Sequence, residues 1–168
     1  MKILTIFLIL VGLTKIINAD EMKSSDSHQL NFFSGVFDIN TSSKKSSDLF
    51  GIQHSNEDLF RDTFLGKLSP ITGFMMTADS TSYLYTGVQA EYKIGKLNLT
   101  PSFSPGLYSM GDGKDLGSPL EFKSELQLSV DLLPGTKLGY SQSHMSNAGL
   151  DDKNPGADSY MFNFMKSF

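Results

Sequence analysis

The sequence predicts an all-β protein: an eight-stranded antiparallel transmembrane β-barrel of the bacterial outer membrane. Three observations lead to this prediction. Apolar and polar residues alternate in the second half, about eight strand-like runs lie between turn residues, and the connections are alternately short and long. The composition agrees, because 15 glycines, 13 phenylalanines and 6 tyrosines in 168 residues are typical of β structure rather than disorder.

The first residues of the sequence predict export. Residues 1–19 are typical of a secretory signal peptide, with Lys2 as the positive residue, the apolar run Ile3–Leu13 and the small residue Ala19 before the expected cleavage site. The apolar run is too short to span a bilayer comfortably, which argues against a membrane anchor. Residues 20–28 are polar and are expected to form a flexible leader, so that residues 29–168 form the barrel.

Charge and cysteine content exclude several classes of function. The chain has a formal net charge of −4 and no basic cluster, which argues against nucleic acid as a partner. It contains no cysteine, so a disulfide framework, a thiolate metal site and a thiol nucleophile are all excluded. The stability of such an exported chain must then come from packing or from a membrane.

The strand-like runs follow one another between clusters of turn residues. The first three alternate poorly, so their boundaries depend mainly on the flanking turn residues. In order, the predicted strands are Gln29–Ile39, Asp48–His54, Lys67–Thr77, Ser82–Ile94, Lys96–Tyr108, Leu120–Leu132, Thr136–Ser146 and Asp158–Phe168.

The sixth run shows the alternation most clearly. One face carries Leu120, Phe122, Leu126, Leu128, Val130 and Leu132, interrupted only by Ser124, and the other carries Glu121, Lys123, Glu125, Gln127, Ser129 and Asp131. A helix of period 3.6 would not separate the residues in this way. The fifth run alternates likewise, although Pro101 and Pro105 each remove a backbone donor from the ladder.

The connections predict that the apolar face contacts lipid and that the interior is polar. The turns at 94–96 and 133–135 are tight, whereas the connections 109–119 and 147–157 are long. Short periplasmic turns and long outer loops are typical of outer-membrane barrels. Because eight strands enclose room for little but side chains, we expect Glu121, Lys123 and Glu125 to form a polar plug rather than a pore.

A candidate chemical site lies in the last predicted hairpin. His144 and Ser146 are two residues apart on one strand, so both side chains point to the same face, and Asp158 begins the next strand. An imidazole beside a hydroxyl is what a general base needs to activate a weak nucleophile. The alternative is a structural turn, since a second tripeptide, His54–Asn56, also reads His-Ser-Asn, but with adjacent residues that face opposite sides.

The parity of the two strands places this site on the lipid-facing wall, near the outer end of the hairpin. His144 and Ser146 share a face with Leu138 and Tyr140, and Asp158 shares a face with Tyr160. Polar groups in that position are expensive in hydrocarbon. Their presence is understandable if the substrate is a lipid ester held in the outer leaflet.

Several blocks of the sequence together resemble the lipid A 3-O-deacylase (PagL-like, acyloxyacyl hydrolase) family. The resemblance covers roughly residues 30–168 and is strongest from residue 86 onward. The blocks that carry it are 101–108 (PSFSPGLY), 113–122 (GKDLGSPLEF), 144–149 (HMSNAG) and 154–156 (NPG), followed by the acid at 158.

This resemblance implies an outer-membrane esterase that hydrolyses the 3-position acyl ester of lipid A, without a metal or other cofactor. By analogy, Ser146 is the nucleophile, His144 its base and Asp158 the orienting acid, at a position that is Glu in the best-known members. The backbone N–H of Gly149 and the side chain of Asn154 are the oxyanion candidates, and Asn147 would orient the loop. Lipid A and the surrounding membrane lipid are then the partners, and the protein is expected to be a monomer or a homodimer. The alternative function is a non-catalytic small barrel that stabilises the membrane or binds a partner.

Overall fold

The computed structural model describes residues 27–39, 46–59, 61–63 and 66–168. The predicted signal peptide, residues 1–19, and residues 20–26 of the predicted leader lie outside this part of the chain. Both assignments therefore stay predictions.

Eight long strands and two short ones form one antiparallel sheet. The long strands are β1 (His28–Phe37), β2 (Ser47–Asn56), β4 (Gly66–Thr77), β5 (Ser82–Ala90), β7 (Leu97–Ser109), β8 (Leu120–Leu133), β9 (Thr136–Ser146) and β10 (Ala157–Ser167), and the short ones are β3 (Arg61–Thr63) and β6 (Tyr92–Ile94). The helical content of the described residues is one 3₁₀ turn, η1 (Glu57–Leu59). No helix in that part of the chain is long and apolar enough to cross a membrane.

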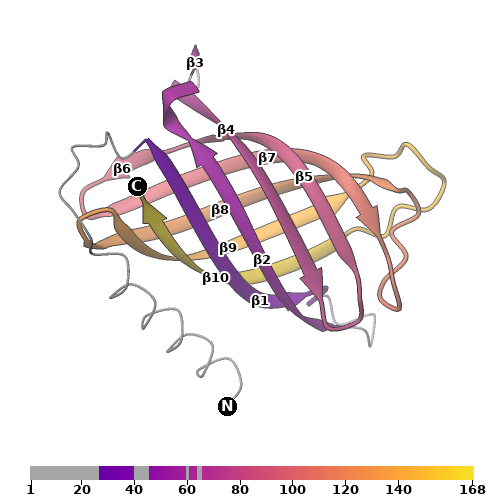
Figure 1. Ribbon diagram of the computed structural model, residues 1–168. Coiled ribbons are helices and arrows are strands. Elements are labelled where there is room, and N and C mark those ends of the chain that lie inside the picture. The colour runs from indigo at the N-terminus through magenta and orange to yellow at the C-terminus, as the bar shows by residue number, and fades with distance from the viewer. Residues whose placement is uncertain (1–26, 40–45, 60, 64–65) are drawn as a thin grey trace.

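The sheet closes on itself. Each long strand pairs with the next, β2 pairs directly with β4, and β1 pairs with β10, so no long strand has a free edge. In Figure 1 the strands run obliquely around one barrel, with the tight β6–β7 and β8–β9 turns at the end near the carboxyl terminus and the long β7–β8 and β9–β10 loops at the other. The predicted eight-stranded antiparallel barrel is therefore confirmed.

The predicted boundaries are accurate in the second half and less so in the first. The prediction for β9 coincides with the observed strand, that for β8 differs by one residue at one end, and those for β7 and β10 differ by one residue at each end. The predicted strand 82–94 is interrupted at Glu91, whose carboxylate accepts hydrogen bonds from Lys137 Nζ at 2.6 and 2.7 Å. The connection 57–65, expected as a loop, contains η1 and β3, and β3 pairs with β4 in a hairpin that projects beyond the barrel (Figure 1).

The outer wall is apolar, as the alternation predicts. Large apolar side chains stand exposed around it, among them Leu84, Phe103, Leu107, Leu126, Leu128, Tyr140 and Phe162, with Leu107 at 64%. In water such a continuous surface would be unfavourable, whereas in a membrane it contacts lipid tails.

The interior is polar in one half and apolar in the other, which corrects the expectation of a uniformly polar interior. Towards the carboxyl-terminal end of the barrel, Asn163 donates to Ser141 Oγ at 2.9 Å and accepts from Asn31 Nδ2 at 2.9 Å. Towards the end with the long loops, the inward side chains form a buried apolar cluster. Its members include Phe33, Phe37, Leu49, Met75, Tyr83, Tyr85, Tyr108, Met145 and Met161.

The predicted interior charges are held by one short ion pair. Lys123 Nζ lies 2.8 Å from Glu125 Oε2, with side-chain exposures of only 1% and 9%, and 4.1 Å from the centre of the Tyr85 ring. A buried charge needs such a partner, because desolvation otherwise costs several kcal/mol. Glu121 is also buried, but its carboxylate has no hydrogen-bond partner among the described residues.

The first prediction concerns this ion pair. Lys123→Met should lower the free energy of unfolding by about 3–5 kcal/mol, because it leaves Glu125 charged and buried without its partner. The double variant Lys123→Met/Glu125→Gln should recover most of that loss. Lys93→Met is the control, since the Lys93–Asp131 pair is exposed to solvent and contributes little to stability. Urea unfolding in lipid vesicles measures all three variants; equal losses for Lys123→Met and Lys93→Met would contradict the prediction.

Candidate functional site

The outer ends of β9 and β10 bring His144 and Asp158 together on the outer wall. The two residues are direct partners in the antiparallel register, so their side chains project side by side from the same face. His144 Nδ1 lies 2.8 Å from Asp158 Oδ1, and the side chains are 56% and 34% exposed. The aspartate therefore reaches the imidazole directly, despite being one methylene shorter than glutamate.

This contact determines which nitrogen of the imidazole remains available. A carboxylate only accepts hydrogen bonds, so Nδ1–H of His144 donates to Asp158 and a neutral ring keeps its lone pair on Nε2. Gly156 lies against that side of the ring. A Cβ added there would come 2.8 Å from His144 Cε1 and 3.2 Å from Nε2. With φ of 60° as well, position 156 favours glycine for two reasons.

Ser146 is the last residue of β9 and shares the outward face with His144. Its side chain is half-buried beside Phe122, its partner on β8. No described residue forms a hydrogen bond with its hydroxyl. Ser146 and the His144–Asp158 pair therefore lie at one place on the wall, with the serine two residues nearer the outer loops.

Two further polar residues surround His144 that the sequence analysis did not assign to the site. Ser124 is the direct partner of His144 on β8, on the side away from Asp158, and Gln142 precedes His144 on the same face of β9. Neither side chain has a hydrogen-bond partner among the described residues. Both line a shallow depression in the wall together with Pro101, Leu126 and His144. Ser124 was visible in the sequence only as a break in an apolar row.

The loop 147–157 that follows Ser146, called the reactive loop below, is ordered by two asparagines. The buried Asn147 accepts a hydrogen bond from Gly149 N at 3.0 Å and donates from Nδ2 to Lys153 O at 2.8 Å. Its own backbone N–H donates to Asn154 Oδ1 at 3.1 Å. The predicted orienting residue thus holds the loop together, and the N–H of Gly149 is engaged with it.

The donors of the reactive loop that have no acceptor in the described part of the chain include the backbone N–H of Ala148 and the side-chain amide of Asn154. Ala148 has φ of 56°, a left-handed conformation that is unusual for a residue other than glycine. No sequence pattern points to Ala148, because a backbone N–H is present at every residue other than proline. The described residues contain no cluster of three or more His, Asp or Glu side chains suited to hold a metal.

Comparison with protein families decides the relationship of this chain. The model of the lipid A 3-O-deacylase (PagL) family matches residues 38–167, most of the barrel and all the residues of the candidate site. The chain belongs to the lipid A 3-O-deacylase family. That family is named for the hydrolysis of an ester-linked acyl chain of lipid A.

Individual relatives agree with this assignment. The lipid A deacylase PagL of Bordetella bronchiseptica is 34% identical over 55 residues, which are 33% of this chain and 31% of that protein. The crystal structure of the outer-membrane enzyme PagL has a TM-score of 0.65 at 19% identity, covering 83% of this chain and 99% of that one. A de novo designed transmembrane β-barrel has a TM-score of 0.53 at 11% identity, over 88% of this chain and 100% of that one. At such identities the solved structures support the fold alone.

The second prediction concerns the space beside His144. Gly156→Ala should displace the imidazole and break its hydrogen bond to Asp158, because the new methyl group overlaps the ring edge. Gly95→Ala is the control: φ is 64° there and 60° at Gly156, so both variants carry a similar backbone strain of about 1–2 kcal/mol. A Cβ at Gly95, however, has nothing within 4 Å.

Imidazole resonances in detergent micelles measure the effect. The His144 signals should shift in Gly156→Ala, whereas those of His28 and His54, on strands at the other end of the barrel, should stay unchanged. Unshifted His144 signals in a folded Gly156→Ala protein would contradict the structural assignment.

Proposed function

We propose that this protein is an outer-membrane serine esterase that hydrolyses the 3-position acyl ester of lipid A. The observation that carries the proposal is the 2.8 Å contact between His144 Nδ1 and Asp158 Oδ1, on the lipid-facing wall beside Ser146. Membership of the lipid A 3-O-deacylase family supplies the substrate. The pair lies near the outer end of the barrel, at the level where an acyl ester of an outer-leaflet lipid would meet the wall.

The proposed roles follow from the atoms that are available. Nε2 of neutral His144 takes the proton of Ser146 Oγ as the oxygen attacks the ester carbonyl carbon. The tetrahedral intermediate collapses when the imidazolium returns that proton to the departing sugar oxygen, which leaves an acyl-serine. Water, deprotonated by the same nitrogen, then releases the fatty acid and restores Ser146. Asp158 holds the ring and stabilises the imidazolium throughout.

The oxyanion donors of this proposal lie on the reactive loop. The backbone N–H of Ala148 and the side-chain amide of Asn154 have no acceptor in the described structure and follow closely after the nucleophile. The N–H of Gly149 can join them once it leaves Asn147 Oδ1. Donors of this kind stabilise the transition state because charge on the carbonyl oxygen develops as the bond to serine forms.

The third prediction concerns the identity of the nucleophile, because two serines lie beside His144. Ser146→Ala should reduce deacylation at least about 10³-fold while the barrel still folds. Ser124→Ala is the matched control and should stay within about threefold of the native rate, because it removes the hydroxyl of the direct cross-strand partner of His144, two register positions further from the reactive loop than Ser146.

Mass spectrometry of lipid A from cells that express each variant provides the measurement, with heat-dependent gel mobility as the test of folding. Loss of one ester-linked acyl chain is expected with the native protein. If Ser124→Ala abolishes the reaction and Ser146→Ala does not, the nucleophile is Ser124. If neither the native protein nor any variant alters lipid A, the non-catalytic alternative holds.

The fourth prediction concerns the acid. Asp158→Asn keeps the shape of the side chain but loses its charge, so its deacylation rate should fall below the native rate. The loss of rate should be about tenfold to a hundredfold smaller than the loss in Ser146→Ala. Asp158→Glu should retain substantial activity, because a carboxylate still reaches Nδ1. Initial rates of 3-O-deacylation in detergent distinguish the three proteins. Equal rates for Asp158→Asn and the native protein would reduce the proposed triad to a Ser-His dyad.

A further inference from the structure

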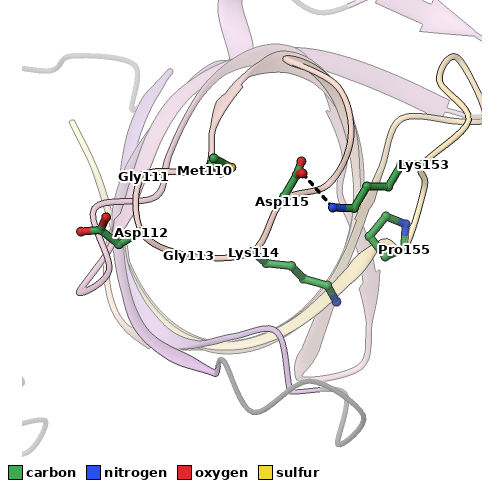
Figure 2. Close-up of a pocket in the computed structure, with 8 residues that line it drawn as sticks. All are labelled: Met110, Gly111, Asp112, Gly113, Lys114, Asp115, Lys153 and Pro155. Carbon is green, nitrogen blue, oxygen red and sulfur yellow. Dashed lines mark hydrogen bonds and ion pairs between the residues drawn. The ribbon is translucent and has the colours of Figure 1, made fainter.

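The long loop 110–119, called the capping loop below, crosses the outer end of the barrel. Figure 2 looks into that end and shows Met110, Lys114 and Asp115 within the outline of the ring of strands, with Asp112 at its edge. The loop continues from β7, and its far end leads into β8. It is therefore positioned over the interior and not folded back along the outer wall.

The capping loop is anchored to the barrel at several points. Leu116 is completely buried and belongs to the apolar cluster of the interior. Tyr108 Oη donates to Lys114 O at 2.6 Å, and Lys114 Nζ lies 2.8 Å from Oδ1 of the buried Asp38. Thr81 Oγ1 donates to Met110 O at 2.7 Å. Anchors to three separate regions of the barrel give this loop a fixed position.

The same loop contacts the reactive loop through three consecutive residues. Leu116 O accepts a hydrogen bond from Asn147 Nδ2 at 3.2 Å, and Asp115 Oδ2 lies 2.7 Å from Lys153 Nζ (Figure 2). Gly117, with φ of 98°, approaches Lys153 so closely that an added Cβ would overlap the Lys153 carbonyl oxygen.

These contacts converge on the amide of Asn147. That side chain is fully buried and joins three groups: Leu116 O of the capping loop, Lys153 O and Gly149 N of the reactive loop. A buried amide that loses its partners is left unsatisfied away from water, so its geometry is strongly held. The Asp115–Lys153 pair is more than half exposed on both sides, so solvent screening makes it a weaker contact than the buried amide. The hydrogen bond from Lys153 keeps the pKa of the Asp115 carboxyl below its ordinary value.

We propose that the capping loop is a positioning element for catalysis: through Gly117 and Leu116 it sets the place of Asn147, and through Asn147 that of the Ala148 and Gly149 donors. None of its residues needs to touch the substrate. The inference rests on the proposed function, because it assigns a purpose to the reactive loop. It adds that a segment about thirty residues away in the sequence determines whether the oxyanion donors are in place.

Gly117→Ala tests this inference, with Gly66→Ala as the matched control. The two glycines have similar φ, 98° and 89°, so the backbone strain is comparable. A Cβ at Gly66 would only make an ordinary contact with Tyr92 at 3.5 Å, far from the reactive loop. We expect Gly117→Ala to lower kcat about tenfold or more with little change in KM, because donors act on the transition state more than on bound substrate. Gly66→Ala should match the native enzyme.

A charge exchange provides a second test that avoids backbone strain. Asp115→Lys places two ammonium groups together and removes the acceptor of the Gly117 N–H, so it should lower kcat about threefold or more. Asp115→Lys/Lys153→Asp restores the ion pair but not that acceptor, so it should recover part of the lost kcat. A role limited to barrel stability would not be rescued in kcat by exchanging the two charges. If Gly117→Ala fails to fold, as judged by heat-dependent gel mobility, this pair of variants decides the question.

Covalent labelling of Ser146 by a fluorophosphonate tests the proposed esterase function and the positioning role of the capping loop separately. If the native protein is labelled and Gly117→Ala is labelled about tenfold more slowly, the inference is supported. If both proteins are labelled at the same rate and have equal kcat, the capping loop has no positioning role, while the proposed function stands. A native protein that remains unlabelled although it folds would overturn the proposed function itself and this inference with it.

Discussion

In hydrocarbon a backbone N–H or C=O without a partner finds no water to bond with, and each such group costs several kcal/mol. The pairing of β1 with β10 meets this constraint, because it joins the two edges of the sheet and closes the barrel. Closure fixes the register of every pair of long strands. That register in turn places Asp158 beside His144 with no help from the loop between them.

The closed wall also places its two surfaces in different environments. Lipid contacts the outer surface, so apolar side chains are stable there and the polar residues of the candidate site are exceptions. The inner surface is sealed from lipid, and its two halves are stabilised differently: paired amides and hydroxyls at one end, and at the other an apolar cluster whose Phe33 and Tyr85 rings lie beside the Lys123–Glu125 ion pair. Leu116 extends that cluster into the capping loop. The apolar cluster therefore continues into the loop that contacts the reactive loop.

The site combines residues held by the strand register with donors whose position depends on loop contacts. His144 and Asp158 belong to strands whose register cannot change without breaking the barrel, so their contact is preorganised. The oxyanion donors belong to a loop, and the loop is ordered by asparagine side chains and by a second loop. An active site of this construction keeps its proton-transfer groups wherever the barrel folds, whereas its charge-stabilising groups depend on contacts at the outer rim.

Period-two alternation in the sequence was enough to determine the fold class, the positions of the later strands and the face on which His144, Ser146 and Asp158 lie. Side chains on a strand can only point to one face or the other, so position along the strand decides this without reference to neighbours. The first three strands alternate poorly, and the prediction missed η1 and β3 between the second and the third. It also missed the interruption at Glu91 in the fourth predicted strand.

Only the tertiary structure decided which residues meet across strands and between loops. Alternation gives the face of Asp158 but not its partner, because partnership depends on the register of both strands and on barrel closure. The position of Ser124 beside His144 could not be predicted for the same reason: the two residues are remote in sequence but direct partners in the strand register. The free N–H of Ala148 and the contact of Gly117 with Lys153 depend on backbone conformation, and residue type alone does not specify that conformation.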